Sequence, residues 1–420
     1  MAGTRTHVRQ ARAIPVRGVR NPRTRPRSLA PFVACFLSLL VLLSPDLTLA
    51  PLHAVEPVVG PRPIDLVDGP RLPRRLSPQP IDDGRTAGPV LRGSAARPDA
   101  SAARYQAALD AARSTASAYG VTFAVVHDGE VVWAGASGRA RDGRTPLDAD
   151  SSFVIGSVTK TFVAATVLQL VQEGRIGLDD PVRQYLPRRA DLSTEITIRQ
   201  LLSHTSGLAD LFNDTTRTGI EEHPERAWTT DEVLATLHAP WYEPGEGWAY
   251  ANTNYLLLGM LVERLTRSTL AEELQRRFIG PLGLGATRVL DGHPGDVLEP
   301  AWTTIFWASG AMSSSAADLA RWGNALYDGG VLAPRTVDAM LNVNEDDYGL
   351  GAQRIELDEE TAGYGHTGLL NTYTTLLVHF PREDATLALL VNRTDVDLAG
   401  MLAAHPGGDG PSLLELALAE

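Results

Sequence analysis

Short runs rich in β-branched and aromatic residues mark the two ends of the folded part of the chain. Near its start, Val121–His127 and Glu130–Gly135 flank the dipeptide Asp128-Gly129. Asp-Gly between two such runs is the preferred two-residue turn of a β-hairpin. Near the C-terminus, Thr374–Phe380 and Thr386–Asn392 have the same character and flank a polar turn. The pattern therefore predicts strands at both ends.

Between these ends, the apolar spacing is mostly helical. One helix start carries Thr269 with Glu272 three residues later, which is the pattern of a capping box. Other segments of helical character are Tyr105–Ala118, Ile198–Leu202, Asp231–Leu237, Tyr255–Leu265 and Ser412–Leu418. We therefore predict an α/β (α+β) fold, with one antiparallel sheet built from both ends of the domain, flanking helices, and an inserted all-helical subdomain.

The segment Phe153–Gly174 is the most informative stretch of the chain. It reads as a helix that begins near Ser157 and is apolar on nearly every face, which is typical of a buried helix. Ser157 and Lys160 are three residues apart, so both side chains project from the same side of the first turn, at the positive end of the helix dipole. A hydroxyl and an amine held together in this way are a candidate nucleophile and its proton acceptor.

Lys160 is also the only lysine in the chain. Arginine in its place would keep the charge but could not deprotonate, whereas burial can lower the pKa of an ammonium enough for it to act as a base. The four-residue pattern alone is more often a chance match on a structural helix. The lone lysine and the buried helix start together favour a function.

The N-terminal region has the layout of a secretory signal. Residues 1–54 hold eight arginines and one acid, and Leu29–Leu43 is an apolar run followed by small residues at Ala50 and Ala54. We interpret this region as a signal peptide or an uncleaved anchor, with cleavage favoured, so that the segment contacts the membrane during export and the protein is secreted or extracytoplasmic. Residues 55–100 read as a Pro/Arg-rich disordered linker, and 101–420 as the folded domain.

Charge and composition exclude several kinds of partner. Without the first 54 residues the chain has 30 basic and 49 acidic residues, a net charge of −19. This acidic balance argues against nucleic-acid binding. The only cysteine, Cys35, lies in the N-terminal apolar run, so the body forms no internal disulfide. The histidines, including Glu221-Glu-His223, lack metal-ligand spacing, and we expect neither a metal nor a cofactor.

Two further motifs combine polar groups with turn residues. Tyr250-Ala-Asn252 places a phenol and a carboxamide two residues apart just before an apolar helix. Gly365-His366-Thr367-Gly368 precedes a strand-like run and is a candidate for the edge of a cleft. Taken singly, each has an equally good structural explanation: a packing aromatic, a turn-forming asparagine, a solvated histidine. His204, in Ser-His-Thr-Ser-Gly, is a further candidate base for a serine nucleophile.

Ser157-Val-Thr-Lys160, Tyr250-Ala-Asn252 and His366-Thr-Gly368 together resemble the three signatures of the serine β-lactamase and penicillin-binding-protein superfamily. Their order and spacing are similar to the class C β-lactamase branch and to actinomycete D-alanyl-D-alanine carboxypeptidases. The resemblance runs from about residue 102 to 395, and it implies a structural role for the segment around His204. One such triplet is a weak signal, but three in this order and context are a strong one.

The resemblance implies catalytic roles for three residues. Ser157 would attack a carbonyl and form an acyl-enzyme, with Lys160 as the proton acceptor beside it. Tyr250 would be a second base, provided that Lys160 makes its phenol more acidic. Backbone N–H groups of Ser157 and Leu369 would form the oxyanion hole, each worth about 3–4 kcal/mol in comparable sites. The substrate-binding positions implied are Asn252, His366, Thr367, Gly368 and Leu369.

Two departures affect what the substrate is expected to be. Most members of the superfamily have lysine at the position of His366, and a histidine there is expected to change its charge near neutral pH. Leu369 replaces a second hydroxyl, which weakens the expectation of a free C-terminal carboxylate on the substrate. Arg354, upstream of His366, is a candidate for the missing cation.

The sequence thus predicts a secreted serine hydrolase, foremost a D-alanyl-D-alanine carboxypeptidase acting on peptidoglycan-type peptides. The alternatives are an esterase or amidase of the same family acting on small esters, and a true class C-like β-lactamase. A non-catalytic binding module is the remaining alternative, and the Ser157–Lys160 pair argues against it, because a binding cleft needs neither residue. The expected partner is therefore a small peptide, ester or β-lactam substrate.

Overall fold

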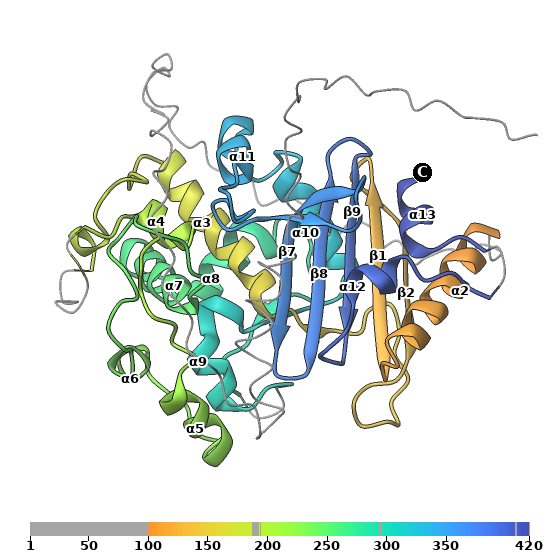
Figure 1. Ribbon diagram of the computed structural model, residues 1–420, viewed down its shortest axis with the longest axis horizontal. Helices are drawn as coiled ribbons and strands as arrows, with labels where there is room; N and C mark the ends of the chain where they lie inside the picture. Colours follow the sequence, from red (N-terminus) through yellow and green to blue (C-terminus); the bar gives the residue numbers. More distant parts are fainter. Residues whose placement is uncertain (1–99, 187–192, 194, 294–295, 408–409, 420) are drawn as a thin grey trace, which may run out of the picture. The chain divides into compact units, whose positions relative to one another are not determined.

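Strands from both ends of the chain pair in one six-stranded antiparallel sheet in the computed structural model (Figure 1). The order is β2-β1-β9-β8-β7-β6, so β1 pairs with β9 across most of the chain length, with Val121 opposite Val391. This confirms the sheet predicted from the sequence. The strands are β1 (Gly120–His127), β2 (Glu130–Gly138), β6 (Gln353–Glu356), β7 (Ala362–Leu370), β8 (Tyr373–Phe380) and β9 (Ala385–Val391).

The structure describes residues 100–186, 193, 195–293, 296–407 and 410–419. The signal or anchor predicted for residues 1–54 and nearly all of the linker predicted for residues 55–100 lie outside these ranges. Within the described residues, no helix is both long and apolar enough to cross a membrane.

The hairpin between β1 and β2 forms as its turn sequence predicts. Asp128 and Gly129 both have positive φ, 48° and 77°. Two central residues in the left-handed region match a two-residue type I′ turn, whose twist suits the flanking strands.

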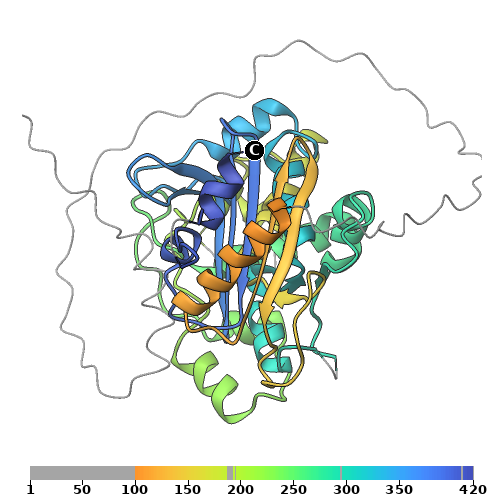
Figure 2. The ribbon, with the colours of Figure 1, turned by 90° about the vertical axis from the view of Figure 1, so that its right-hand side faces the viewer.

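Helices cover both faces of the sheet. The register aligns Ala124, Ala388 and Leu377 across β1, β9 and β8. Leu377 lies directly under Gly323 of α10 (Ala316–Tyr327), where the missing side chain lets the helix approach closely. On the opposite face Tyr105 of α2 stacks on Trp133 of β2, and α2 (Ala100–Thr115), α12 (Leu398–Leu402) and α13 (Leu413–Leu418) pack together there (Figure 2).

The middle of the chain forms the predicted helical region beside β7. The predictions around Ile198, Asp231, Tyr255 and Thr269 correspond to helices α4, α6, α7 and α8, and capping boxes begin α4, α6 and α8. The helices are α3 (Thr159–Gln172), α4 (Ile198–Leu202), α5 (Asp214–Glu222), α6 (Thr230–Ala235), α7 (Asn252–Thr266), α8 (Leu270–Leu274), α9 (Pro300–Gly310) and α11 (Pro334–Leu341).

This region is not entirely helical, in contrast to the sequence-based prediction. A small antiparallel sheet of order β3-β5-β4 joins Phe153–Val154, Met312–Ser314 and Arg288–Val289. Its strands have two or three residues each, which is too short for a periodic signal in the sequence. This small sheet helps to place the site, because β3 leads directly into the turn that carries Ser157.

Candidate active site

Ser157 and Lys160 lie where a tight turn becomes a buried helix. Ser157 is in the 3₁₀ turn η1 (Gly156–Val158), which continues into α3, and it remains partly accessible. The Lys160 side chain has no exposed surface. Its Nζ is 3.0 Å from Ser157 Oγ. The predicted pair is therefore in direct hydrogen-bond contact.

Two further oxygens surround the Lys160 amine. Nζ donates to Asn252 Oδ1 at 2.8 Å and to the Ser309 carbonyl at 2.7 Å. Asn252 is the first residue of α7, and Ser309 lies near the end of α9. Three elements that are distant in sequence thus converge on a single amine.

A carboxylate fixes the orientation of Asn252. Asp210 Oδ1 accepts from the Asn252 backbone N–H at 3.0 Å, and Asp210 Oδ2 accepts from Asn252 Nδ2 at 3.2 Å. Because a carboxylate only accepts, the amide nitrogen must face Asp210 and the amide oxygen must face Lys160. Burial raises the pKa of Asp210, whereas hydrogen bonds from Phe212 and Asn252 and the nearby Lys160 charge act in the opposite direction.

Tyr250 occupies the loop that leads into α7, as the sequence predicts. The centroid of its ring is 4.9 Å from Lys160 Nζ. The Tyr250 ring also stacks on His204, with ring centroids 4.2 Å apart and an interplanar angle of 27°. The phenol ring therefore lies close to both the lysine and a buried histidine.

The opposite wall of the site is the second half of β7, which packs directly against η1. A Cβ added to Gly368 would lie 2.0 Å from the Ile155 carbonyl oxygen and 3.3 Å from Ser157 N. Gly156 has φ +50°, and a Cβ on it would lie 2.7 Å from Leu369 N. These close approaches require glycine and bring the backbones around Ser157 and Leu369 together, as the predicted oxyanion hole needs.

His366 has a different environment from the one expected. Its ring is fully buried, with Nε2 3.0 Å from Tyr348 Oη and Nδ1 2.5 Å from the Thr367 carbonyl. Both ring nitrogens are used inside the protein, which leaves neither for a substrate. Burial, followed by the Lys160 charge, lowers the pKa of His366 to about 3. The expectation that its charge changes near neutral pH is therefore wrong.

The neighbouring groups of β7 and β6 are also engaged. Thr367 N and Oγ1 both donate to Gln353 Oε1, at 2.9 and 3.1 Å. Arg354, the candidate for the missing cation, forms ion pairs with Glu356 and with Asp347. Its guanidinium is thus neutralised by two carboxylates, and the proposal that it supplies a cation to the site is not supported by the structure.

Sequence analysis missed Asp210, Ser309 and Tyr348 as site residues. Ser309 contributes only its backbone carbonyl, which carries no side-chain signal. Its position follows from a kink in α9, where Trp307 has φ 20° and ψ −109°. The signal that could have found Asp210 is its place three residues after Ser206-Gly207, in the turn before the aromatic Phe212.

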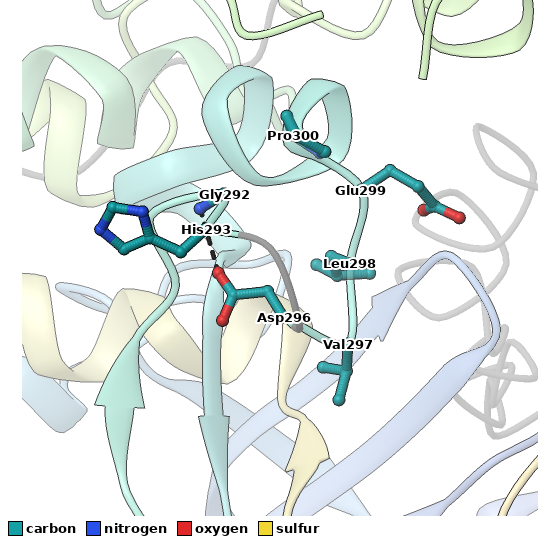
Figure 3. Close-up of a pocket in the computed structure, with 7 residues that line it drawn as sticks. All are labelled: Gly292, His293, Asp296, Val297, Leu298, Glu299 and Pro300. Atoms are coloured by element: carbon teal, nitrogen blue, oxygen red, sulfur yellow. Dashed lines mark hydrogen bonds between the residues drawn. The ribbon is translucent and has the colours of Figure 1, made fainter. Parts of the chain in front are cut away.

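A separate pocket lies at the N-terminus of α9 (Figure 3). It has a volume of about 210 Å³ and contains none of the predicted site residues. Asp296 Oδ2 accepts from Gly292 N at 3.0 Å across it. Its lining residues are Gly292, His293, Asp296, Val297, Leu298, Glu299 and Pro300. Among the described residues of the chain, no group of three or more His, Cys, Asp or Glu side chains is placed to hold a metal ion.

Known proteins are similar to this chain in sequence and in fold. The family model described as Beta-lactamase matches residues 105–404. Penicillin-binding protein 4 of Amycolatopsis lactamdurans is 30% identical over 69% of this chain and 85% of its own length. Penicillin-binding protein 4* of Bacillus subtilis strain 168 is 26% identical over 60% of this chain, and the match spans 63% of its own length.

Among solved structures, a D-stereospecific amidohydrolase from Streptomyces sp. superposes with a TM-score of 0.60 and 31% identity. The superposition covers 69% of this chain and 94% of the amidohydrolase. The match to the family model covers well over half of the chain. The chain therefore belongs to the beta-lactamase family of serine hydrolases, which includes penicillin-binding proteins.

Proposed function

We propose that this protein hydrolyses amide or ester bonds through an acyl-enzyme on Ser157, and that its preferred substrates carry a free amino group. The observation that carries the first part is the set of three oxygens around Lys160 Nζ. The second part rests on the charges that surround the site.

The hydrogen bonds of Lys160 suit a proton acceptor. Asn252 Oδ1 and the Ser309 carbonyl oxygen accept from Nζ and cannot donate to it. A neutral amine has two N–H groups, which these two oxygens take up. Its lone pair then faces Ser157 Oγ, 3.0 Å away. The same three oxygens also satisfy the three donors of the ammonium, so the site accommodates Lys160 before and after it takes a proton.

In the proposed reaction, the Ser157 hydroxyl proton passes to Lys160 as Oγ bonds to the substrate carbonyl carbon. The developing oxyanion accepts hydrogen bonds from the N–H groups of Ser157 and Leu369. The proton then returns to the leaving amine or alcohol as the carbonyl re-forms and the acyl-enzyme is left. Water repeats these steps to release the acid and regenerate Ser157. Tyr250, beside Nζ, is the second group proposed to carry this proton.

The charge distribution favours a free amino group over a free carboxylate on the substrate. His366 is buried and neutral, Arg354 is paired with two acids, and Leu369 offers no hydroxyl. In contrast, the carboxylate of Asp210 is half-buried and contacts Asn252, the residue expected to bind the substrate's amide. The similarity to a D-stereospecific amidohydrolase supports amides with a D-configured centre as the substrate class.

A D-alanyl-D-alanine carboxypeptidase is the second candidate. The two penicillin-binding-protein relatives favour it, as does the order of the three motifs. A β-lactamase differs from it chiefly in the rate at which the acyl-enzyme is hydrolysed, and an esterase differs in its leaving group. Export by residues 1–54, and hence action outside the cytoplasm, remains a proposal from the sequence.

A comparison of substrates separates these functions. We expect kcat/KM for D-alanine p-nitroanilide to exceed that for its N-acetyl derivative, and acetyl-D-alanyl-D-alanine to be the poorest of the three. Asp210→Asn should reduce the preference for the free amine about tenfold, because a desolvated charge pair is lost. The matched control is Asp214→Asn, an exposed acid on α5. A higher kcat/KM for the D-alanyl-D-alanine peptide would instead establish the carboxypeptidase.

A further inference from the structure

Two buried histidines and one tyrosine connect the opposite walls of the site. His204 Nε2 is 3.2 Å from Tyr348 Oη, and Tyr348 Oη is 3.0 Å from His366 Nε2. His204 stacks on the Tyr250 ring, which precedes α7. His366 lies in β7 on the opposite wall. All three side chains are buried, with at most 2% of their surface exposed. The catalytic scheme proposed above uses none of these three groups.

These side chains form a hydrogen-bond chain, and the groups at its two ends determine which partner donates in each bond. The Ala251 backbone N–H donates to His204 Nδ1 at 3.1 Å, so this nitrogen carries no proton. Asn254 Nδ2 lies 2.9 Å from the same nitrogen, and its amide is oriented by the Ser206 hydroxyl, which donates to Asn254 Oδ1 at 2.6 Å. In a neutral ring the proton is then on Nε2, and His204 donates to Tyr348.

The other end gives the same direction. The Thr367 carbonyl can only accept, so His366 Nδ1, 2.5 Å away, must carry the proton. Nε2 of a neutral His366 is then an acceptor, and Tyr348 is left to donate its hydroxyl proton to it. The two histidines are therefore opposite tautomers. The Tyr255 side chain also hydrogen-bonds to Tyr348, but Tyr255 donates its own proton to the Leu202 carbonyl at 3.0 Å.

We propose that Tyr348 is a positioning residue. Through the directed hydrogen bonds that run from Ala251 to Thr367, it holds the Tyr250 ring and the Thr367–Leu369 segment in one relative geometry. His366 then serves this hydrogen-bond chain through both ring nitrogens and is no substrate contact. Burial and the Lys160 charge lower the pKa of both histidines, which keeps the rings in the neutral form that the chain requires. This inference rests on the proposed function in one respect, namely that Tyr250 and Leu369 N serve the acylation of Ser157.

The first test needs no catalytic activity. In the full protein labelled with ¹⁵N-histidine, NMR should show neutral rings for both residues at pH 7, with the proton on Nε2 of His204 and on Nδ1 of His366. His204→Gln and His366→Gln assign the two signals. The opposite tautomer at either residue, or a protonated ring, would overturn the proposal.

The second test is the rate of acylation by a p-nitrophenyl ester. Tyr348→Phe leaves the ring in place but removes the hydroxyl. We expect acylation to slow about 10- to 100-fold with little change in KM, because the two walls of the site are no longer hydrogen-bonded to a common group. The matched control is Tyr105→Phe, which removes a buried hydroxyl bonded to the Leu416 carbonyl under the other face of the sheet. Its acylation rate should equal that of the wild type.

The possible failures are distinguishable. If the wild-type protein forms no adduct at Ser157, the proposed function fails, and the tautomers still decide whether the chain exists. If the wild type and Tyr348→Phe acylate equally fast, the proposed function stands and the positioning role is refuted. If Tyr348→Phe does not fold, the tautomers of His204 and His366 in the wild-type protein alone decide whether the proposal holds.

Discussion

Lys160 and the histidine pair His204 and His366 are all fully buried, yet they have opposite surroundings. Lys160 meets three oxygens, two of which can only accept. His204 instead receives two N–H donors at Nδ1. Burial disfavours charge at all three residues, but Lys160 has an acceptor for every proton of its charged form, whereas a proton on His204 Nδ1 would face two donors. The difference shows that hydrogen-bond partners, as well as burial, decide which buried group of this site can take up a proton.

Lys160→Arg is the substitution expected to have the largest effect on the lysine side of the site. Arginine keeps the charge but cannot accept a proton, and we expect acylation of Ser157 to slow on the order of 10³-fold. Pre-steady-state release of p-nitrophenol measures this rate, and far-UV circular dichroism checks the fold. Since the Lys160 side chain is fully buried, Lys160→Met serves as a companion of similar length. Acylation at the normal rate in the Lys160→Arg variant would contradict the assignment of Lys160 as proton acceptor.

The contact between the two walls is tested by Gly368→Ala. The new Cβ would collide with the Ile155 carbonyl, so η1 and β7 must separate and the two proposed oxyanion donors with them. We expect kcat to fall about 10²-fold and unfolding free energy to fall by about 1–3 kcal/mol. Gly285→Ala is the control, because no atom lies within 4 Å of a Cβ there and its φ is not positive. Normal kcat in Gly368→Ala would exclude this oxyanion hole.

The histidine side is tested by the pH dependence of stability. Burial lowers the pKa of His366 from 6.5 to about 3, so between these values the unfolded chain binds a proton that the native protein does not. Stability is thus full above about pH 6.5 and decreases as the pH falls, by up to about 1.4 kcal/mol per pH unit for each such histidine. His379, whose pKa burial lowers to about 4, adds to this slope.

Urea unfolding at about pH 7, 6, 5 and 4 measures the slope. His366→Gln should make it shallower by up to about 1.4 kcal/mol per pH unit, whatever its effect on stability at neutral pH. His223→Gln, at an exposed position, should leave the slope unchanged. An unchanged slope in His366→Gln would mean that this histidine is not held neutral by the fold.

The parts of the fold that could be predicted from the sequence are those specified locally. The β1–β2 turn follows from Asp128-Gly129, and the start of α8 follows from Thr269 and Glu272. The Ser157–Lys160 pair is equally local, since the two residues share one turn. The parts that could not be predicted depend on contacts between distant segments. The Ser309 carbonyl is 149 residues from Lys160, and a backbone group has no residue type by which to recognise it.

His366 shows the limit of assigning a role by position in a motif. Its place in His-Thr-Gly predicts a substrate contact with a charge that depends on pH. Its actual partner, Tyr348, lies 18 residues earlier in the chain, and nothing in either motif pairs the two. The neutral state of the ring follows from its burial, which only the assembled fold creates.

Intact-mass spectrometry after exposure to a penicillin or a p-nitrophenyl ester, followed over time, tests the central claim most directly. We predict one adduct per chain, located by peptide mapping to the segment 153–174 and absent from Ser157→Ala. A long-lived penicillin adduct would point to a penicillin-binding enzyme, and rapid loss of the adduct with drug hydrolysis to a β-lactamase. An adduct on another residue, or turnover that persists in Ser157→Ala, would contradict the acyl-enzyme on Ser157.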